Sequence, residues 1–113
     1  MGSGTTLVEA KLLGRNAVGV DINPQSVLIS ETNLQFQCES NSKIYTRNGS
    51  ATDLNFIKDN RIDFVCTHPP YANIIKYSKG VDGDISLLNV EDFLNEMKKA
   101  AEESYRVLRK GKM

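Results

Sequence analysis

Short blocks of apolar residues alternate with polar segments along the chain, and their spacing predicts helices and strands in turn. Apolar residues three and four positions apart predict a first helix that Thr5 or Thr6 caps and Gly14 stops. Its expected apolar stripe consists of Leu7, Val8, Leu12 and Leu13. Nearly continuous apolar runs predict strands over residues 17–22, 43–48 and 61–67.

Two more helices follow from capping residues and apolar spacing. Asn23 can cap the second helix and Pro24 fits its first turn, and the pattern extends this helix to about Cys38. A third helix is predicted over roughly residues 90–109, preceded by a mobile loop over 72–89 that is rich in Gly, Asp and Ser. The apolar stripe expected for the third helix consists of Val90, Phe93, Leu94, Met97, Ala101 and Leu108.

Strands that alternate with helices favour an α/β fold, in which right-handed crossovers build a parallel sheet with flanking helices. The strands are nearly all apolar, which is typical of strands buried on both faces. Polar residues follow each strand: Asp21, then Ser50 and Asp53, then residues 68–71. Because the carboxyl ends of parallel strands meet at one edge of the sheet, these loops predict a ligand site there.

Composition and charge narrow the function. A chain of 113 residues forms one domain at most, and its 40% hydrophobic content suits a globular protein. The formal net charge is zero, so any nucleic-acid role must take its phosphate contacts from elsewhere. No apolar run approaches membrane-spanning length, and the first residues do not have the basic-then-apolar pattern expected of a leader. Cys38 and Cys66 lack metal-ligand neighbours, which predicts buried thiols in a reducing cytoplasm and no metal site.

Three loop segments carry candidate binding chemistry. The glycine-rich turn at residues 2–4 opens directly into the first helix, where glycines allow a ligand to approach and free N–H groups attract negative charge. Asp21 follows at the end of a strand, where a carboxylate can accept hydrogen bonds from both ribose hydroxyls or can cap a helix. Residues 48–54 form either an ordinary turn or a loop that contacts an adenine ring. Together, in this order, the three segments favour a nucleoside-containing cofactor.

The sequence "HPPY" at residues 68–71 is the most specific motif. Two consecutive prolines make the backbone rigid, so that it can fix a carbonyl oxygen that accepts a hydrogen bond from an amino group. Tyr71 offers a flat face on which a planar base can stack, and His68 can accept or donate near neutral pH. The alternative is that the prolines only end a strand, that Tyr71 packs on the core, and that His68 is structural.

The segments "GSGTT", "GVDIN", "NGSATDL" and "HPPYANIIKYS" together resemble the amino-methylating DNA methyltransferases, over nearly the whole chain. That family transfers a methyl group from S-adenosylmethionine to N4 of cytosine or N6 of adenine. The resemblance therefore implies a Rossmann-like fold with S-adenosylmethionine as the cofactor. The implied cofactor contacts are Gly2, Ser3, Gly4 and Thr5 for the methionine part, Asp21 with Ile22 for the ribose, and Ser50, Ala51 and Asp53 for the adenine.

The catalytic residues that the resemblance implies are His68, Pro69, Pro70 and Tyr71. His68 stands where the family has aspartate, asparagine or serine, so the choice between cytosine and adenine stays open; Ser50 likewise replaces the family's usual aspartate. In the implied mechanism, His68 and the Pro69 carbonyl accept hydrogen bonds from the exocyclic amine. Its lone pair is thereby freed for in-line attack on the sulfonium methyl, while Tyr71 stacks on the flipped base.

The resemblance also implies that residues 1–113 are part of a catalytic domain, namely its cofactor-binding half and the HPPY loop. The family's first strand and the strands after the long helix would be missing, so we expect an incomplete sheet and no methylation by this fragment alone. DNA would bind mostly through regions outside this chain, in the cytoplasm and without a membrane partner, and the oligomeric state stays open. Three alternatives remain: an RNA base amino-methyltransferase, an oxidoreductase that uses NAD, and a non-catalytic fragment that binds the cofactor weakly or not at all.

Overall fold

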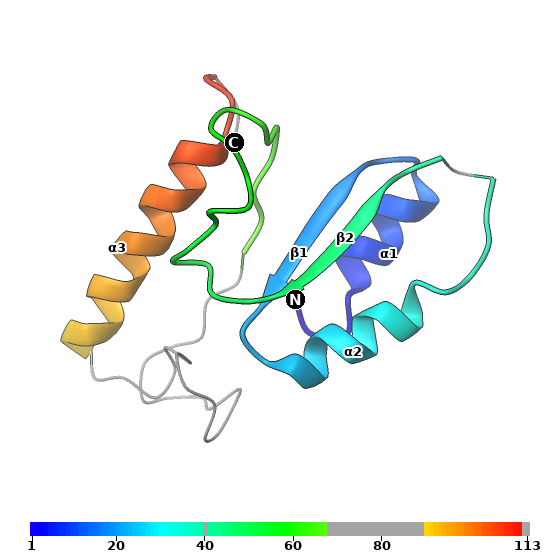
Figure 1. The fold of residues 1–113 in the computed structure, drawn as a ribbon, viewed down its shortest axis with the longest axis horizontal. Helices are drawn as coiled ribbons and strands as arrows, with labels where there is room; N and C mark the ends of the chain where they lie inside the picture. The colour runs from blue at the N-terminus through cyan, green and yellow to red at the C-terminus, as the bar shows by residue number, and fades with distance from the viewer. Residues whose placement is uncertain (40, 68–89, 112–113) are drawn as a thin grey trace. The chain divides into compact units, whose positions relative to one another are not determined.

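The computed structural model describes residues 1–39, 41–67 and 90–111 (Figure 1). The chain divides into an N-terminal unit, Met1–Gly49, and a C-terminal unit, Ser50–Met113. The N-terminal unit holds α1 (Thr5–Leu12), β1 (Ala17–Asp21), α2 (Pro24–Asn33) and β2 (Ile44–Asn48), and the C-terminal unit holds α3 (Val90–Val107). The HPPY motif and the predicted loop 72–89 lie outside the described residues.

The sheet of the N-terminal unit has two parallel strands, with Ala17 opposite Ile44 and Asp21 opposite Asn48. Helix α2 connects the two strands, and Figure 1 shows the strands side by side with α1 and α2 beside them. Parallel strands need such a crossover, because a short turn cannot bring the chain back in the same direction. The predicted α/β fold with a parallel sheet and flanking helices is therefore confirmed for this unit.

Both helices cover the same face of the sheet. A Cβ atom on Gly19 would lie 2.6 Å from the Cδ1 atom of Leu7, so α1 packs directly on this glycine. Thr46, the register partner of Gly19, donates a hydrogen bond of 2.6 Å to Glu31 on α2. Because paired residues point to the same side of a sheet, the face that carries Gly19 and Thr46 is the helix-covered one.

No helix of the N-terminal unit covers the opposite face of the sheet, and its side chains are partly exposed, which corrects the prediction that the strands are buried on both faces. Val18 and Tyr45 are partners on this face and are 37% and 61% exposed. The physical reason is the placement of α1 and α2, which lie together on the other side and leave this face without a helix from their own unit. The apolar strand pattern alone does not distinguish one covered face from two.

Helix α2 begins as predicted but ends early. The Asn23 side chain accepts a hydrogen bond of 2.9 Å from the Gln25 amide, and Pro24 occupies the first turn. The helix ends at Asn33 rather than near Cys38. Lys11 explains the early end, because its ammonium donates to the carbonyls of residues 34 and 36, at 2.6 Å each, and lies 4.4 Å from the centre of the Phe36 ring.

Helix α1 begins at Thr5 with Gly4 as the capping residue and without a side-chain cap, so the predicted cap by Thr5 or Thr6 is wrong. The prediction that Gly14 stops the helix is confirmed, since Gly14 has φ of 72° just beyond the last turn. Only one member of the predicted stripe is buried, because a helix of 8 residues presents a short contact face to the sheet. Leu7 is that residue, whereas Leu12 and Leu13 are 54% and 72% exposed.

The C-terminal unit contains no third strand among its described residues, which corrects the prediction for residues 61–67. This segment makes one isolated bridge, between Ile62 and Leu108. The Ile62 amide donates to Val107 and the Ile62 carbonyl accepts from Arg109, at 2.8 Å each. The backbone that was expected to pair with a neighbouring strand is therefore bonded to the end of α3 instead.

Helix α3 confirms the third predicted helix, but its buried side differs from the predicted stripe. Val107 is 1% exposed and Phe93 and Met97 are half-buried, whereas Leu94 is 61% exposed and Ala101 is also exposed. The loop that leads to Ile62 defines the buried side, because it packs against the last two turns of the helix. The predicted stripe therefore joined residues from two sides of α3.

Candidate cofactor site

The glycine turn before α1 is held against α2. The Gly4 amide donates to the Met1 carbonyl at 3.1 Å, and both Gly2 and Gly4 have positive φ, of 59° and 84°. Ser30 of α2 is fully buried and its hydroxyl donates to the Gly2 carbonyl at 3.2 Å. A Cβ atom on Gly4 would lie 2.8 Å from the Cβ and Oγ atoms of Ser30, so only glycine fits there.

The turn leaves hydrogen-bond donors free at the start of α1. Helix starts carry unsatisfied N–H groups and a partial positive charge. The amides of Thr5, Thr6 and Leu7 have no acceptor among the described residues, and the helix has no side-chain cap. Such a helix start can bind an anionic group of a ligand.

Asp21, at the carboxyl end of β1, lies beside the glycine turn. Its Oδ1 atom accepts a hydrogen bond of 2.9 Å from the Asn23 amide, and its Oδ2 atom lies 3.0 Å from the nitrogen of Met1. The side chain is 16% exposed. The structure thus brings the carboxylate to the beginning of the turn, and a carboxylate there can accept hydrogen bonds from the hydroxyl groups of a ligand.

Asn48 supports this edge of the sheet, a role that the interpretation of residues 48–54 as a turn or an adenine loop did not include. Its Nδ2 atom donates to the carbonyls of Asp21 and Ile22, at 3.0 Å each. The Gly49 amide also donates to the Asp21 carbonyl at 3.0 Å. Asn48 therefore fixes the backbone that carries the Asp21 carboxylate.

Asn48→Ala is expected to lower the free energy of unfolding by about 1–2 kcal/mol, because two backbone carbonyls lose a donor. The measurement is chemical denaturation followed by circular dichroism. Asn33→Ala is the matched control, because its amide donates to only one carbonyl, that of Ser3 at 3.0 Å. A larger loss for Asn33→Ala than for Asn48→Ala would contradict the proposed weight of the Asn48 contacts.

The loop after β2 belongs to the C-terminal unit and is folded on itself. The Ser50 hydroxyl lies 2.7 Å from the Thr52 hydroxyl and accepts from the Thr52 amide at 3.1 Å. The Asp53 amide donates to the Ser50 carbonyl at 3.1 Å, and the Asp53 carboxylate accepts from the Asn55 amide at 3.2 Å. Ala51 is exposed between them. That these residues join the glycine turn and Asp21 in one site stays a prediction.

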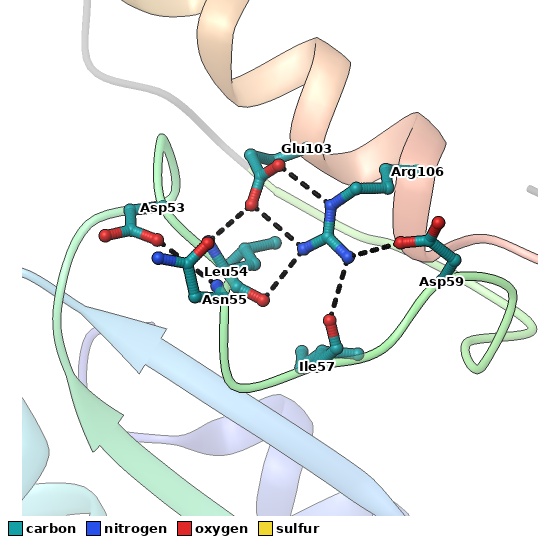
Figure 2. A network of polar contacts seen from close by, with 7 residues as sticks. All are labelled: Asp53, Leu54, Asn55, Ile57, Asp59, Glu103 and Arg106. Atoms are coloured by element: carbon teal, nitrogen blue, oxygen red, sulfur yellow. Dashed lines mark hydrogen bonds and ion pairs between the residues drawn. The ribbon is translucent and has the colours of Figure 1, made fainter.

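A clamp formed by Glu103 and Arg106 of α3 holds the residues that follow this loop, as Figure 2 shows. Glu103 Oε2 accepts from the Leu54 amide at 2.7 Å, and Arg106 Nη2 donates to the Leu54 carbonyl at 2.9 Å. Arg106 also donates to the Ile57 carbonyl at 2.9 Å and to Asp59 Oδ1 at 2.7 Å. Two further bonds, of 2.9 and 3.0 Å, join the guanidinium to the Glu103 carboxylate.

The family follows from a comparison with known proteins. A model of the RMKL-like methyltransferase domain matches residues 1–110, nearly the whole chain and both units. The chain belongs to this family. The prediction of a methyltransferase is thereby confirmed.

One curated relative of this RMKL-like domain is the Type II methyltransferase M.MjaII of Methanocaldococcus jannaschii, with 54% identity over 35 residues. The matched segment is 31% of this chain, and the chain spans only 7% of the length of that relative. No solved structure matches the chain.

The two cysteines of the RMKL-like domain are exposed free thiols, which corrects the prediction that they are buried. Cys38 lies beyond the early end of α2, and Cys66 lies in the segment that forms no strand, so the elements that were expected to bury them are absent there. In the described residues, no group of three or more His, Cys, Asp or Glu side chains is arranged to hold a metal ion. No helix in that part of the chain is long and apolar enough to cross a membrane.

The clamp also shifts the ionisation of its members. The hydrogen bond from Arg106, with a second one from the Leu54 amide, lowers the pKa of the Glu103 carboxyl below its ordinary value of 4.5. The hydrogen bonds to Glu103 and Asp59 raise the pKa of the Arg106 guanidinium. Both groups are therefore charged at neutral pH, as the clamp geometry requires.

The free energy of unfolding of the RMKL-like domain is expected to decrease as the pH is lowered in the acid range, because Glu103 becomes protonated. A carboxyl whose pKa is lowered by folding stabilises the protein above its unfolded pKa and loses that contribution as pH falls through the folded pKa. Unfolding free energies measured between about pH 6 and about pH 3 test this. Glu103→Gln should lower stability most at the upper end of this range, and the difference from wild type should shrink towards the lower end. A difference that is constant across the range would contradict the role of the charge.

Proposed function

We propose that this chain forms the S-adenosylmethionine-binding part and base-pocket loop of a methyltransferase that acts on an exocyclic amine of a DNA base, N4 of cytosine or N6 of adenine. The observation that carries the proposal is the closeness of the glycine turn and the Asp21 carboxylate at the carboxyl end of β1. The similarity to a Type II methyltransferase supports DNA as the substrate class.

The N-terminal unit fits two parts of S-adenosylmethionine. The free amides at the start of α1 suit the carboxylate of the methionine part, because both the amides and the helix dipole favour negative charge. Each oxygen of Asp21 has a second lone pair beyond its bond to Asn23 or Met1, which can accept from a ribose hydroxyl. The proposed contacts in this unit are Gly2, Ser3, Gly4, Thr5, Asp21 and Ile22.

The adenine is proposed to contact Ser50, Ala51 and Asp53 in the loop after β2. Short side chains and a self-bonded turn leave this backbone accessible to a flat ring. This arrangement corresponds to a Rossmann-like sheet in which the loops after successive parallel strands meet one nucleoside. The parallel pair of β1 and β2 supports that part of the proposal.

S-adenosylmethionine supplies an electrophilic methyl group, and the HPPY motif is proposed to prepare the nucleophile. The amine lone pair is delocalised into the base ring. In the proposed mechanism, His68 and the Pro69 carbonyl accept hydrogen bonds from the two N–H groups of the amine. These bonds free the lone pair. Pro70 keeps the loop rigid. Tyr71 stacks on the flipped base, a contact that contributes about 1–3 kcal/mol.

DNA is proposed to bind mostly through parts of the protein beyond these residues. The formal net charge of the chain is zero, and affinity for duplex DNA depends on cations that replace phosphate counterions. We therefore expect the 113-residue chain to bind the cofactor without methylating DNA by itself.

Calorimetric titration of the purified chain with S-adenosylmethionine and with NAD tests the cofactor. We expect saturable binding of S-adenosylmethionine and none of NAD. Tighter binding of NAD would indicate the oxidoreductase alternative, and no binding of either would indicate a non-catalytic fragment.

Incubation with labelled S-adenosylmethionine and mixed-sequence DNA or RNA tests the substrate and the dependence on further residues. We expect no label in either nucleic acid with the chain alone. Robust labelling of DNA would show that the chain is a complete catalyst, and labelling of RNA alone would replace DNA as the substrate class.

A further inference from the structure

We infer that Glu103 and Arg106 are positioning residues for the adenine loop and set its selectivity for the adenine ring. They act through the backbone of Leu54, which follows directly after Asp53. This inference rests on the proposed function, in which residues 50–53 meet the adenine.

The clamp holds both backbone groups of one residue. The Leu54 amide donates to Glu103 Oε2 at 2.7 Å, and the Leu54 carbonyl accepts from Arg106 Nη2 at 2.9 Å (Figure 2). The Leu54 N–H lies in the same planar peptide unit as the Asp53 carbonyl and points the opposite way. Glu103 therefore fixes the direction of the Asp53 carbonyl.

The adenine loop is anchored at its start by its own bonds and at its end by the clamp. The Asp53 amide donates to the Ser50 carbonyl, which closes the turn, and the next peptide unit is the one that Glu103 holds. Together these contacts leave little rotation at Asp53. The loop backbone can then offer hydrogen bonds to a ring edge at a fixed angle, and hydrogen bonds weaken steeply when that angle is poor.

Packing alone does not account for the clamp. The Leu54 side chain is 8% exposed, so burial already holds the residue in place. Burial is non-directional, however, whereas paired hydrogen bonds to N–H and C=O fix the orientation of the peptide. Directional contacts on a residue that is already buried suggest that orientation itself matters here.

Arg106 suits this role better than lysine because every donor of its rigid fork is used. Its five N–H groups meet both oxygens of Glu103, the carbonyls of Leu54 and Ile57, and Asp59. A lysine ammonium has three donors on a flexible stem and cannot reproduce this planar pattern. Arg106→Lys therefore keeps the charge while it releases the loop.

The test compares two nucleoside ligands that differ only at the ring edge. S-adenosylhomocysteine carries an amino group on the ring, and S-inosylhomocysteine carries a carbonyl at the same position. Calorimetry gives the Kd of each for the wild-type chain, Arg106→Lys and Glu103→Gln, with circular dichroism as a check on folding. Arg109→Ala is the matched control, because it breaks an exposed ion pair of 3.0 Å with Asp63 and leaves Leu54 untouched.

In wild type we expect S-adenosylhomocysteine to bind more tightly than S-inosylhomocysteine. In Arg106→Lys, the ratio of the two Kd values should fall by about 5- to 10-fold, the change that one misdirected hydrogen bond produces. In Glu103→Gln the ratio should fall by less. Arg109→Ala should keep the wild-type ratio. Glu103→Gln retains a carbonyl that can accept from Leu54 and is the milder variant if Arg106→Lys does not fold.

An unchanged ratio in folded variants, including the case in which both Kd values rise equally, would show that the clamp is only structural and would overturn the inference. If the wild-type chain binds neither ligand, the proposed function itself is contradicted. The wild-type titrations alone show this outcome, so it is distinct from a failure of the inference.

Discussion

Asp21→Ala is expected to weaken binding of S-adenosylmethionine by about 1–3 kcal/mol, an affinity loss of about 5- to 150-fold. The carboxylate lies at the end of β1, is 16% exposed, and in the proposed complex accepts from the ribose hydroxyls. Hydrogen bonds to a charged acceptor are stronger than neutral ones, so their loss is large. Calorimetric titration of both proteins measures the difference.

Asp21→Asn is the control that separates binding from folding. An asparagine oxygen can still accept from the Asn23 amide, as Asp21 Oδ1 does at 2.9 Å, while the negative charge is removed. We expect an intermediate loss of affinity, with a smaller loss of stability than in Asp21→Ala, because only the contact with the Met1 nitrogen is lost. If Asp21→Ala binds as wild type does and remains folded, Asp21 is not part of the cofactor site.

Gly4→Ala is expected to destabilise the N-terminal unit by about 2–4 kcal/mol. Two costs add. The residue has φ of 84°, a region that disfavours any Cβ atom, and the new Cβ would lie 2.8 Å from the Cβ and Oγ atoms of Ser30. Ser30 is fully buried and cannot move aside without shifting α2. Chemical denaturation followed by circular dichroism measures the loss.

Gly2→Ala is the matched control for this prediction. Gly2 also has positive φ, of 59°, but nothing lies within 4 Å of a Cβ atom placed there. Its substitution should cost only the backbone strain, about 1–2 kcal/mol. If Gly2→Ala and Gly4→Ala lower the free energy of unfolding equally, close packing against Ser30 is not a reason that position 4 requires glycine.

Local signals in the sequence predicted the local structure well. Asn23 and Pro24 identified the start of α2 because capping depends on neighbours in the chain. Asp21 was correctly placed at the end of a strand. Such features depend on residues that are close in the sequence, so capping residues and apolar spacing can predict them.

The sequence predictions that were wrong share a different cause. Each concerns a feature that depends on a contact between distant parts of the chain. Helix α2 ends early where Lys11 reaches across from α1 to the carbonyls of Leu34 and Phe36, just beyond the helix. At the start of the expected strand 61–67, the backbone of Arg61 and Ile62 bonds to the end of α3 instead of to a strand. The same loop selects which side of α3 is buried. Apolar spacing predicted the three helices and the strands β1 and β2, but it does not identify the partners of a segment.

Asn48 and Arg106, the supporting residues of the proposed site, were missed for the same reason. Asn48 reaches back 26 and 27 residues to hold Ile22 and Asp21, and Arg106 reaches 52 residues to hold Leu54. In the sequence, Asn48 resembles a turn residue and Arg106 a solvated helix charge. Side chains that position others carry no local signature, because their role depends on where the fold places their partners.

Lys11 and Arg106 are bonded within the protein, and this changes how the salt dependence of nucleic-acid binding should be interpreted. Lys11 donates to two backbone carbonyls, and every N–H of Arg106 has an acceptor. Counterions leave a nucleic acid only when cations reach its phosphates, so the slope of log affinity against log salt counts accessible cations alone. Of the 14 lysines and arginines in the sequence, these two belong to the interior chemistry of the fold. A salt titration with any nucleic acid would therefore leave Lys11 and Arg106 out of the count of cations that reach phosphates.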